Sequence, residues 1–252
     1  MNDSNHQLAT VRRTFEILEL LWENDSLGVT ELADHLDTHR STVHAYLRTL
    51  EATGFVINVD GRYRLGFRFL EFGGRVKYRN RLFRASQTEL THLADDTGFT
   101  AVLTIEENGE LVIAHIEDGQ RSLQLGLYTG MRNPLHANAS GKAILAYSST
   151  EEIDQFFATR TLEAPTEHTK TDPDAIRDEL AAIRETGYAC DWDEQVIGMG
   201  LLGAPIIVAG SVLGAIGLVC PTNQVTDEDQ RSDLAKRVKQ SADIISVNYQ
   251  YG

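Results

Sequence analysis

Residues 26 to 54 constrain the fold of this chain more than any other stretch. The run "SLGVTELADHL" (26–36) predicts a short helix, with Thr30 as its N-cap before Glu31. The run "RSTVHAYLRTLEATG" (40–54) predicts a second helix that ends at Gly54, a residue suited to a C-terminal cap. Only "DTH" separates the two runs. Two helices joined by so short a turn, with a further helix before them, have the order of a helix-turn-helix.

The preceding helix is predicted from "VRRTFEILELLWEN" (11–24). This run places Val11, Phe15, Leu18 and Trp22 on one helical face. It supplies the first helix of the three.

The second helix of the pair has two chemically different faces. Val43, Leu47 and Leu50 form a narrow apolar stripe at 100° per residue. The opposite side has short polar side chains, an arginine and no carboxylate: Ser41, Ala45 and Arg48, flanked by Thr42, His44 and Thr49. Such a face can approach base edges, whereas carboxylates would be repelled by phosphates. A plain solvated face is the alternative, but on an acidic chain it would be expected to carry Asp and Glu.

A β-hairpin is predicted directly after this helix, in "FVINVDGRYRLG" (55–66). Asp60-Gly61 between two β-prone runs is a strong signal for a two-residue turn. Arg62 and Arg64 share one face of the second strand, and Tyr63 lies on the other. A hairpin with paired arginines beside a recognition helix is typical of a wing on the sugar-phosphate backbone. Residues 1–70 are therefore predicted to form a winged helix-turn-helix domain.

Charge is distributed unevenly along the chain. The net charge is −14, yet residues 1–84 hold 12 basic and 11 acidic side chains. This difference indicates two tasks in two segments. Lysine is also scarce, which favours a surface adapted to high salt; an ordinary acidic cytosolic protein is the alternative. No apolar run is long enough to span a bilayer and the N-terminus has no signal-peptide pattern, so we expect a cytoplasmic protein without a membrane partner.

Residues 71–84 are predicted to form an inter-domain linker helix region. The segment is basic, and its cations have no acid among them: Arg75, Lys77, Arg79, Arg81 and Arg84. They could touch DNA backbone or bridge acidic surfaces, and the sequence favours neither. The pattern continues as a helix to Gly98.

Residues 85–252 are predicted to form an α+β domain with an antiparallel sheet and flanking helices. Asn108-Gly109 predicts a second hairpin, "RSLQLGLYTG" (121–130) alternates as a strand, and a helical region extends to about Ala158. A helix follows from Pro173, capped by Asp172, to Gly187. "YACDW", "MGLLGAPIIV" and "SVLGAIGLVC" predict strands, and a long final helix is expected with Thr226 as its cap.

The stretch "HANASGKAILAY" (136–147) contains a Ser-Gly-Lys but is not a phosphate-binding loop. The loop's first glycine would be His136, and its Mg²⁺-binding hydroxyl would be Ala143. Two interpretations remain. The backbone N–H groups of residues 138–141 could hold an anionic or carbonyl group of a ligand. Alternatively, the small residues let a helix pack closely on the sheet.

Cys190 and Cys220 lie in apolar stretches and are expected to be buried and structural. They are too few for a disulfide framework or a metal site, and no cofactor is expected. A cysteine redox enzyme would need an accessible thiolate near a base or cation. Neither cysteine has a His or Lys close in sequence, so this alternative function ranks behind DNA binding.

Over essentially its whole length the chain resembles the IclR family of transcriptional regulators. The matching patterns are "RTFEIL", "LADHLDTHRSTVHAYLRTLEATGFV", "GRYRLG", "RNPLHANASGKAILA", "ETGYACDWDE", "GAPII" and "GAIGLVCP". The resemblance implies a winged helix-turn-helix, a GAF-like effector-binding domain, and a homodimer or homotetramer. It is not an enzyme family. Asp37 and Thr38 depart from the family's turn pattern, and Asp tolerates the unusual turn geometry.

Site residues follow from the resemblance by position. It implies an effector pocket formed by Leu125, Ala139, Ser140, Asp191, Met199, Leu201, Gly217 and Val219. Asp191 would hydrogen-bond a ligand hydroxyl or protonated group; a turn residue at a strand end is the alternative. Gly217 and Val219 stand where some relatives with small-acid effectors have serines, so a two- or three-carbon acid is not favoured.

The predicted function is a ligand-responsive regulator of a catabolic gene set. Ser41, Thr42, His44, Ala45 and Arg48 would face bases, and Thr38, His39, Arg40, Arg62 and Arg64 would complete the DNA contacts, chiefly to phosphates. A dimer should prefer a palindromic operator. The effector implied by the resemblance is a sugar-derived or aromatic metabolite.

Overall fold

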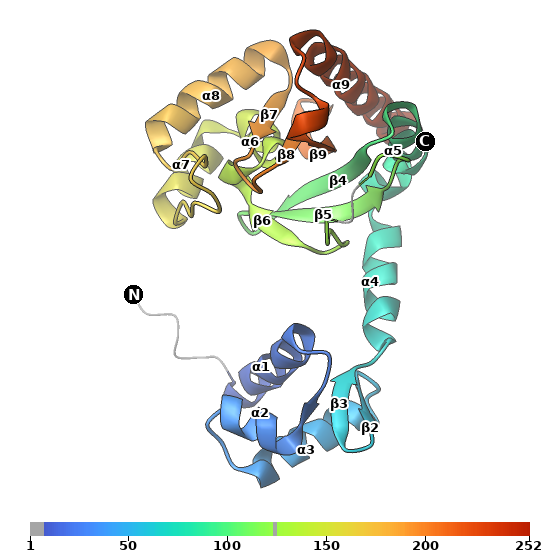
Figure 1. Cartoon of the computed structure of the whole chain (residues 1–252), viewed down its shortest axis with the longest axis vertical. Coiled ribbons are helices and arrows are strands. Elements are labelled where there is room, and N and C mark those ends of the chain that lie inside the picture. The colour runs from blue at the N-terminus through green and yellow to red at the C-terminus, as the bar shows by residue number, and fades with distance from the viewer. Residues whose placement is uncertain (1–7, 123–124) are drawn as a thin grey trace. The chain divides into compact units, whose positions relative to one another are not determined.

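The computed structural model describes residues 8–122 and 125–252 and divides into two compact units, Met1–Arg79 and Asn80–Gly252 (Figure 1). Each unit has its own hydrophobic core, and the larger one has a core on either face of its sheet. Within the described residues, no helix is long and apolar enough to cross a membrane.

The N-terminal unit is the predicted winged helix-turn-helix. Its elements are α1 (Ala9–Glu23), β1 (Leu27–Gly28), α2 (Val29–His35), α3 (Arg40–Ala52), β2 (Val56–Val59), β3 (Arg62–Leu65) and α4 (Arg68–Arg79). The strands form an antiparallel sheet in the order β1-β3-β2. Val43, Leu47 and Leu50 of α3 are buried against α1 and α2, as the apolar stripe predicted. The two-residue strand β1 was not predicted, because it is too short to show a sequence pattern.

Turn chemistry explains the shape of this unit. Asp60 and Gly61 have φ of 52° and 83°, the pair of positive values that a type I′ hairpin turn requires. Asp37 has φ of 45° in the turn between α2 and α3. The expectation that Asp would tolerate this turn is therefore confirmed.

Two details of the first helices differ from the sequence prediction. The face of Val11, Phe15 and Trp22 is largely exposed, and the fully buried residues of α1 are Ile17 and Leu21. The N-cap of α2 is Gly28 instead of Thr30. The Glu31 carboxylate accepts a 2.6 Å hydrogen bond from the Gly28 N–H, which fixes the helix start one turn ahead of that carboxylate.

The C-terminal unit is the predicted α+β domain. Its first half contains α5 (Arg81–Thr97), β4 (Thr100–Glu107), β5 (Glu110–Glu117), β6 (Arg132–Pro134), the 3₁₀ turn η1 (Leu135–Ala137), α6 (Ala139–Ala146) and α7 (Thr150–Thr159). Its second half contains α8 (Pro173–Thr186), β7 (Ala189–Trp192), β8 (Met199–Val208), β9 (Ser211–Pro221), the 3₁₀ turn η2 (Thr222–Gln224) and α9 (Glu228–Tyr251).

The sheet is antiparallel, in the order β6-β5-β4-β9-β8-β7. Helices α5 and α9 cover one face, where they bury residues such as Phe83, Leu90 and Val238. Helices α6 and α8 pack on the other face. Strands β6 and β7 are the two edge strands of the sheet. In Figure 1 the sheet curls so that the face covered by α6 is concave.

Three predictions in this unit need correction. In the stretch 121–130, residues 125–128 form no strand, because β6 and Gly130 already pair with the free edge of β5; residues 123–124 lie outside the described part. The cap of α9 is Asp227, whose carboxylate accepts from the Asp229 N–H, and not Thr226. The predicted inter-domain helix is two helices, because the Asn80 side chain accepts from the Phe83 N–H and starts α5 anew.

Candidate DNA-binding surface and effector cavity

The outer face of α3 is exposed and carries no carboxylate. Ser41, Thr42, His44, Ala45 and Arg48 are all exposed there, opposite the buried stripe. His39 is the N-cap residue and Arg40 is the first residue of the helix, and both are exposed. Thr38 is half-buried in the turn. The structure therefore places the predicted base-facing residues together on one continuous surface.

The two wing arginines have different surroundings. Arg62 is held within the unit: its guanidinium donates to the Ser26 carbonyl at 2.6 Å and lies 3.1 Å from the Glu31 carboxylate. Arg64 is exposed and forms no ion pair or hydrogen bond with the described residues. Only Arg64 thus has its full set of donors available, while Arg62 fastens β3 to the start of α2.

A partly open cavity of about 120 Å³, here called the internal cavity, lies against the larger sheet. All six strands of the sheet, β4 to β9, and the loops after β5 and β7 contribute to its wall. Its lining is mostly apolar with a few polar groups: Val102, Thr104, Leu111, Ile113, Leu125, Leu127, Met131, Asn133, Asn138, Asp191, Gln195, Val196, Met199, Gly200, Leu201 and Val219. This combination is typical of a small-molecule site.

Asp191 is the one ionisable residue among the described lining residues. It is 3% exposed, at the end of β7. Burial raises the pKa of its carboxyl group to about 7, although Oδ1 accepts a 2.8 Å hydrogen bond from the Glu194 N–H. The carboxyl group is therefore about half ionised near neutral pH and can accept a hydrogen bond from a ligand.

The start of α6 is closed by its own side chain. Asn138 Oδ1 accepts from the Ser140 N–H at 2.9 Å and from the Gly141 N–H at 3.4 Å. Close packing also fixes this helix: a Cβ on Gly203 would lie 2.7 Å from the Ser140 nitrogen, and one on Gly141 would lie 2.2 Å from the Leu135 carbonyl oxygen. The geometry favours the packing interpretation of the small residues, since these two amides already have an acceptor.

Ser140 has an unusual environment. Its hydroxyl oxygen is fully buried and has no hydrogen-bond partner, and a Cβ on Gly217 would lie 2.6 Å from it. An unsatisfied buried hydroxyl costs about 1–3 kcal/mol. Ala139, Ser140 and Gly217 are not among the residues that line the cavity.

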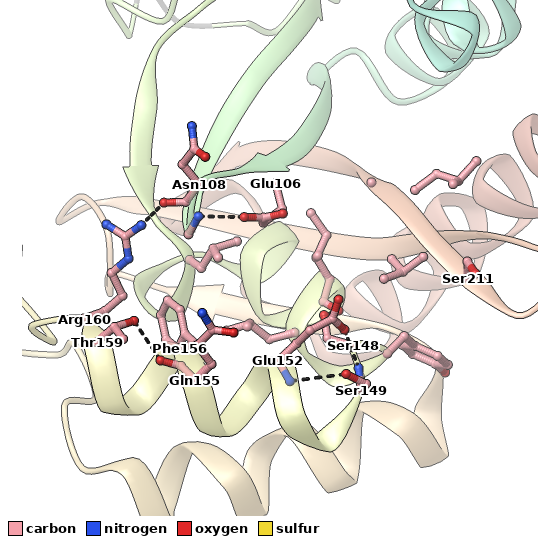
Figure 2. A pocket seen from close by; sticks show the side chains of 18 of the residues that line it. Glu106, Asn108, Ser148, Ser149, Glu152, Gln155, Phe156, Thr159, Arg160 and Ser211 are labelled. Atoms are coloured by element: carbon pink, nitrogen blue, oxygen red, sulfur yellow. Dashed lines mark hydrogen bonds between the residues drawn. The ribbon is translucent and has the colours of Figure 1, made fainter.

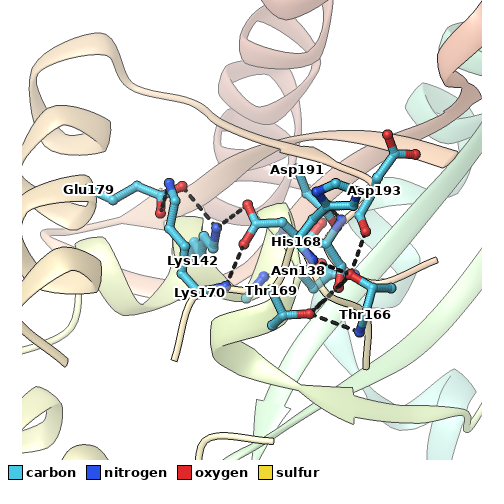
Figure 3. Close-up of polar contacts among 12 residues, drawn as sticks. Asn138, Lys142, Thr166, His168, Thr169, Lys170, Glu179, Asp191 and Asp193 are labelled. Carbon is cyan, nitrogen blue, oxygen red and sulfur yellow. Dashed lines mark hydrogen bonds and ion pairs between the residues drawn. The ribbon is translucent and has the colours of Figure 1, made fainter. Parts of the chain in front are cut away.

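A buried ionic network supports the loop after β7 from outside the cavity (Figure 3). The Lys142 ammonium is fully buried and lies 2.6 Å from Glu194 and 2.9 Å from Glu179. Lys170 pairs with the other oxygen of Glu179 at 2.9 Å. Thr169 donates to the Glu194 carbonyl at 2.6 Å, so four segments of the chain meet at this loop.

The loop also contacts the start of α6. Asn138 Nδ2 donates to Gln195 Oε1, so one side chain both caps α6 and holds the cavity wall. Asp191 is tied to this loop because its Oδ1 accepts from the Glu194 N–H, while the Glu194 side chain is held by Lys142.

A larger groove of about 900 Å³ lies between α7 and the β4–β5 and β8–β9 turns (Figure 2). Most of its polar groups are already engaged. Arg160 donates to the Asn108 carbonyl, Glu106 accepts from the Gly109 N–H, and Ser149 and Glu152 form the capping box of α7. Because these polar groups are engaged, the groove offers few free orienting groups, and the smaller internal cavity is the better ligand site.

The cysteines do not form a reactive site. Burial raises the pKa of Cys190 to about 11 and that of Cys220 to about 12, and the Cys220 thiol donates to the Gly200 carbonyl. Cys220 is fully buried and Cys190 partly so. No group of three or more potential metal ligands occurs among the residues that the structure describes.

Five of the eight predicted effector residues line the internal cavity: Leu125, Asp191, Met199, Leu201 and Val219. Leu125 does so from a loop and not from a strand. Four polar lining residues were not predicted from the sequence: Thr104, Asn133, Asn138 and Gln195. Nothing local marks Thr104 or Asn133, whose position in the wall depends on strand pairing. Asn138 was noticed only as a backbone position.

A winged helix-turn-helix unit together with a separate α+β unit that encloses a small cavity defines a class, the ligand-responsive DNA-binding transcriptional regulators. Residues 10–59 match the IclR helix-turn-helix domain, and residues 76–247 match the bacterial transcriptional regulator IclR C-terminal domain. The chain belongs to the IclR family, a family of regulators and not of enzymes. The redox-enzyme alternative is therefore not supported.

Individual relatives match over the full length. A probable HTH-type transcriptional regulator ArcR of Halobacterium salinarum is 29% identical over 98% of this chain and 95% of its own. The crystal structure of Thermotoga maritima IclR is 28% identical, with a TM-score of 0.83 over 97% of this chain and 100% of that one. An IclR homolog of Microbacterium hydrocarbonoxydans, complexed with 4-hydroxybenzoate, has the same fold at 20% identity, with a TM-score of 0.82 over 97% of this chain and 100% of that one.

Proposed function

We propose that the outer face of α3 reads base edges in the major groove of a specific operator. The observation that carries this is the exposed surface of Ser41, Thr42, His44, Ala45 and Arg48, which has no carboxylate on a chain of net charge −14. Arg48 is the residue of this set able to form a bidentate contact with guanine. Arg40 and Arg64 contact phosphates on either side, with Thr38 and His39 at the start of the helix.

Arg62 serves the same surface by holding the wing in place. Its guanidinium is occupied by Ser26 and Glu31, so a phosphate contact would have to compete with an ion pair. The wing therefore presents one free cation, Arg64, and one fastening residue, Arg62.

We infer that the N-terminal units act in pairs on a palindromic operator. Large apolar side chains are exposed on two helices of this unit: Val11 and Phe15 on α1, and Leu70 and Val76 on α4, with exposed fractions between 49% and 73%. Helix α4 has no buried residue. A second copy of the chain would cover such faces isologously, as a two-fold axis requires.

The effector binds in the internal cavity and shifts the protein between states of different DNA affinity. Such a switch requires the ligand to bind one state more tightly than the other. Asp191 is the polar anchor and the surrounding leucines form the wall. The regulated genes would serve catabolism of the effector or a related metabolite, in the cytoplasm.

The surface charge supports a host with a salt-rich interior. Of 23 basic residues only 5 are lysines, and the chain has 37 acidic residues. The similarity to a regulator of Halobacterium salinarum is in accord with this. In such a host, DNA binding must depend on base contacts and packing, because each phosphate contact weakens steeply with salt.

A selection of random DNA duplexes by the purified protein, at several salt concentrations, tests this function. We expect a palindromic motif that Arg48→Ala loses. Lys236→Ala is the matched control, since it removes one exposed cation from α9 and should leave the motif unchanged. Absence of any enriched motif at every salt concentration, with and without added metabolites, would contradict the proposal. A flat salt dependence supports the halophilic host, and a steep decline opposes it.

A further inference from the structure

The internal cavity offers no positive charge to a ligand. Among its described lining residues the one ionisable side chain is a carboxyl group, Asp191, and no Lys, Arg or His is present. The nearest buried cation is Lys142, which lies behind the wall and is already paired with Glu179 and Glu194. A carboxylate ligand would lose its hydration and find no counter-ion here.

The helix N-terminus does not replace the missing cation. The N–H groups of Ser140 and Gly141 point at Asn138 Oδ1, and Asn138 is held in that position by its second bond, to Gln195. An anion could reach these amides only by displacing the cap and with it the loop after β7. The usual anion site of a helix start is thus filled from within the chain.

Asn133 is a second polar anchor in the cavity. It lies on β6, is 8% exposed, lines the cavity, and its side chain has no hydrogen-bond partner among the described residues. Its amide atoms keep accessible surface, so they can bond a ligand or water in the cavity. Its register partner Leu111 also lines the cavity, so the amide is set in an apolar part of the wall.

The two anchors come from opposite edges of the sheet. Asn133 is on β6 and Asp191 is on β7, the first and last strands in the order, and both line the same cavity because the sheet curls. The space between them is bounded by Leu111, Ile113 and Val219. At about 120 Å³ it approaches the roughly 150 Å³ of an apolar cavity that holds one benzene molecule.

We propose that the effector is an uncharged, single-ring-sized molecule with hydroxyl groups at two positions, one donating to Asp191 and the other bonded to Asn133, and that it has no carboxylate. Asn133 is then a specificity-determining residue. This inference rests on the proposed function, since it concerns the ligand of the same regulator. The high pKa of Asp191 agrees with it, because the carboxyl group needs no cationic partner.

A panel of four ring compounds tests the ligand class: resorcinol, phenol, benzoate and 4-hydroxybenzoate. Binding to the full-length protein is measured by calorimetry and by saturation-transfer NMR. We expect resorcinol to bind about tenfold more tightly than phenol, as one added hydrogen bond provides, and neither carboxylate to bind at about 10 mM.

The variant Asn133→Leu, of nearly equal shape, separates this role from a structural one. It should reduce resorcinol affinity about tenfold, to that of phenol, and leave phenol affinity unchanged. Asn133→Ser gives a second, smaller variant in case the first folds poorly. Gln155→Leu, in the separate groove beside α7, is the control and should change neither affinity.

Three outcomes would overturn the inference: tighter binding of either carboxylate than of phenol, an unchanged resorcinol affinity in both Asn133 variants, or no binding of either phenol at about 10 mM. The operator selection on the same preparation keeps this separate from the proposed function. If an operator is recovered and the carboxylates bind, only the ligand class is wrong. If no operator is recovered at all, the regulator proposal itself fails.

Discussion

Replacement of Lys142 by Met should destabilise the C-terminal unit strongly. The Lys142 ammonium is fully buried, 2.6 Å from Glu194 and 2.9 Å from Glu179, whose side chains are 9% and 17% exposed. Loss of one partner from a buried ion pair costs about 3–5 kcal/mol, because the other charge is left without compensation. Lys170 still pairs with Glu179, so only Glu194 loses its cation and the expected cost is at the lower end, about 3 kcal/mol.

Thermal and urea unfolding measure this cost. For a unit of this size, about 3 kcal/mol corresponds to a fall in Tm of roughly 6–12 °C. Lys236→Met, the same change at an exposed position of α9, is the control and should cost no more than about 0.5 kcal/mol.

The double variant Lys142→Met/Glu194→Gln decides the mechanism. Neutralising Glu194 removes the uncompensated charge, so stability should recover by about 1–2 kcal/mol relative to Lys142→Met alone. If Lys142→Met costs less than about 1 kcal/mol, or if the double variant is no more stable than the single one, then the ion pair does not fix the loop after β7 and the reasoning is refuted.

Three further predictions concern charge and exposure. The Asp191 carboxyl group has a pKa raised from 3.8 to about 7, so its ionisation opposes folding increasingly as the pH rises from about 4 through 7. Asp191→Asn should therefore gain about 2.5 kcal/mol in relative stability between pH 5 and pH 8, measured by urea unfolding, and parallel pH profiles would contradict this. Arg48→Ala should weaken operator binding about 10- to 100-fold and relax the preference at one base, and equal effects on operator and random DNA would count against base reading. Arg64→Ala should weaken binding to all duplexes alike. Arg62→Ala should lower the Tm of the N-terminal unit, because it removes the ion pair with Glu31. Cys190 and Cys220, with thiol pKa values of about 11 and 12, should react with a maleimide at neutral pH only after unfolding, and rapid labelling of the native protein would show that burial does not protect them.

The sequence predicted those features that depend on neighbouring residues. Asp60-Gly61 and Asn108-Gly109 both form hairpin turns with positive φ, because few other residue pairs accept that backbone geometry. Asp172 caps α8 and Gly187 ends it at φ of 80°, as predicted. These signals are local, so they survive without knowledge of the tertiary structure.

Features that depend on distant segments were missed. Helix α1 has apolar residues on more than one side, and periodicity alone does not tell that Ile17 and Leu21 are buried while Phe15 is exposed. Lys142 and Glu194 are 52 residues apart, and only the packed fold brings them together. Asn133 lies in the cavity wall because β6 pairs with β5. Strand β6 has only 3 residues and is too short to be recognised from its sequence.

The glycines around α6 limit which positions close to the cavity can change in evolution. Gly141, Gly203 and Gly217 each have another group within 2.2–2.7 Å of the position of a Cβ, so no side chain is tolerated there without moving the helix or the strand. Asn133 and Gln195 line the cavity itself and already carry side chains, so they can be exchanged for others. A lineage that acquires a new inducer, or a laboratory that builds a biosensor from this scaffold, would therefore find its useful mutations among such lining residues.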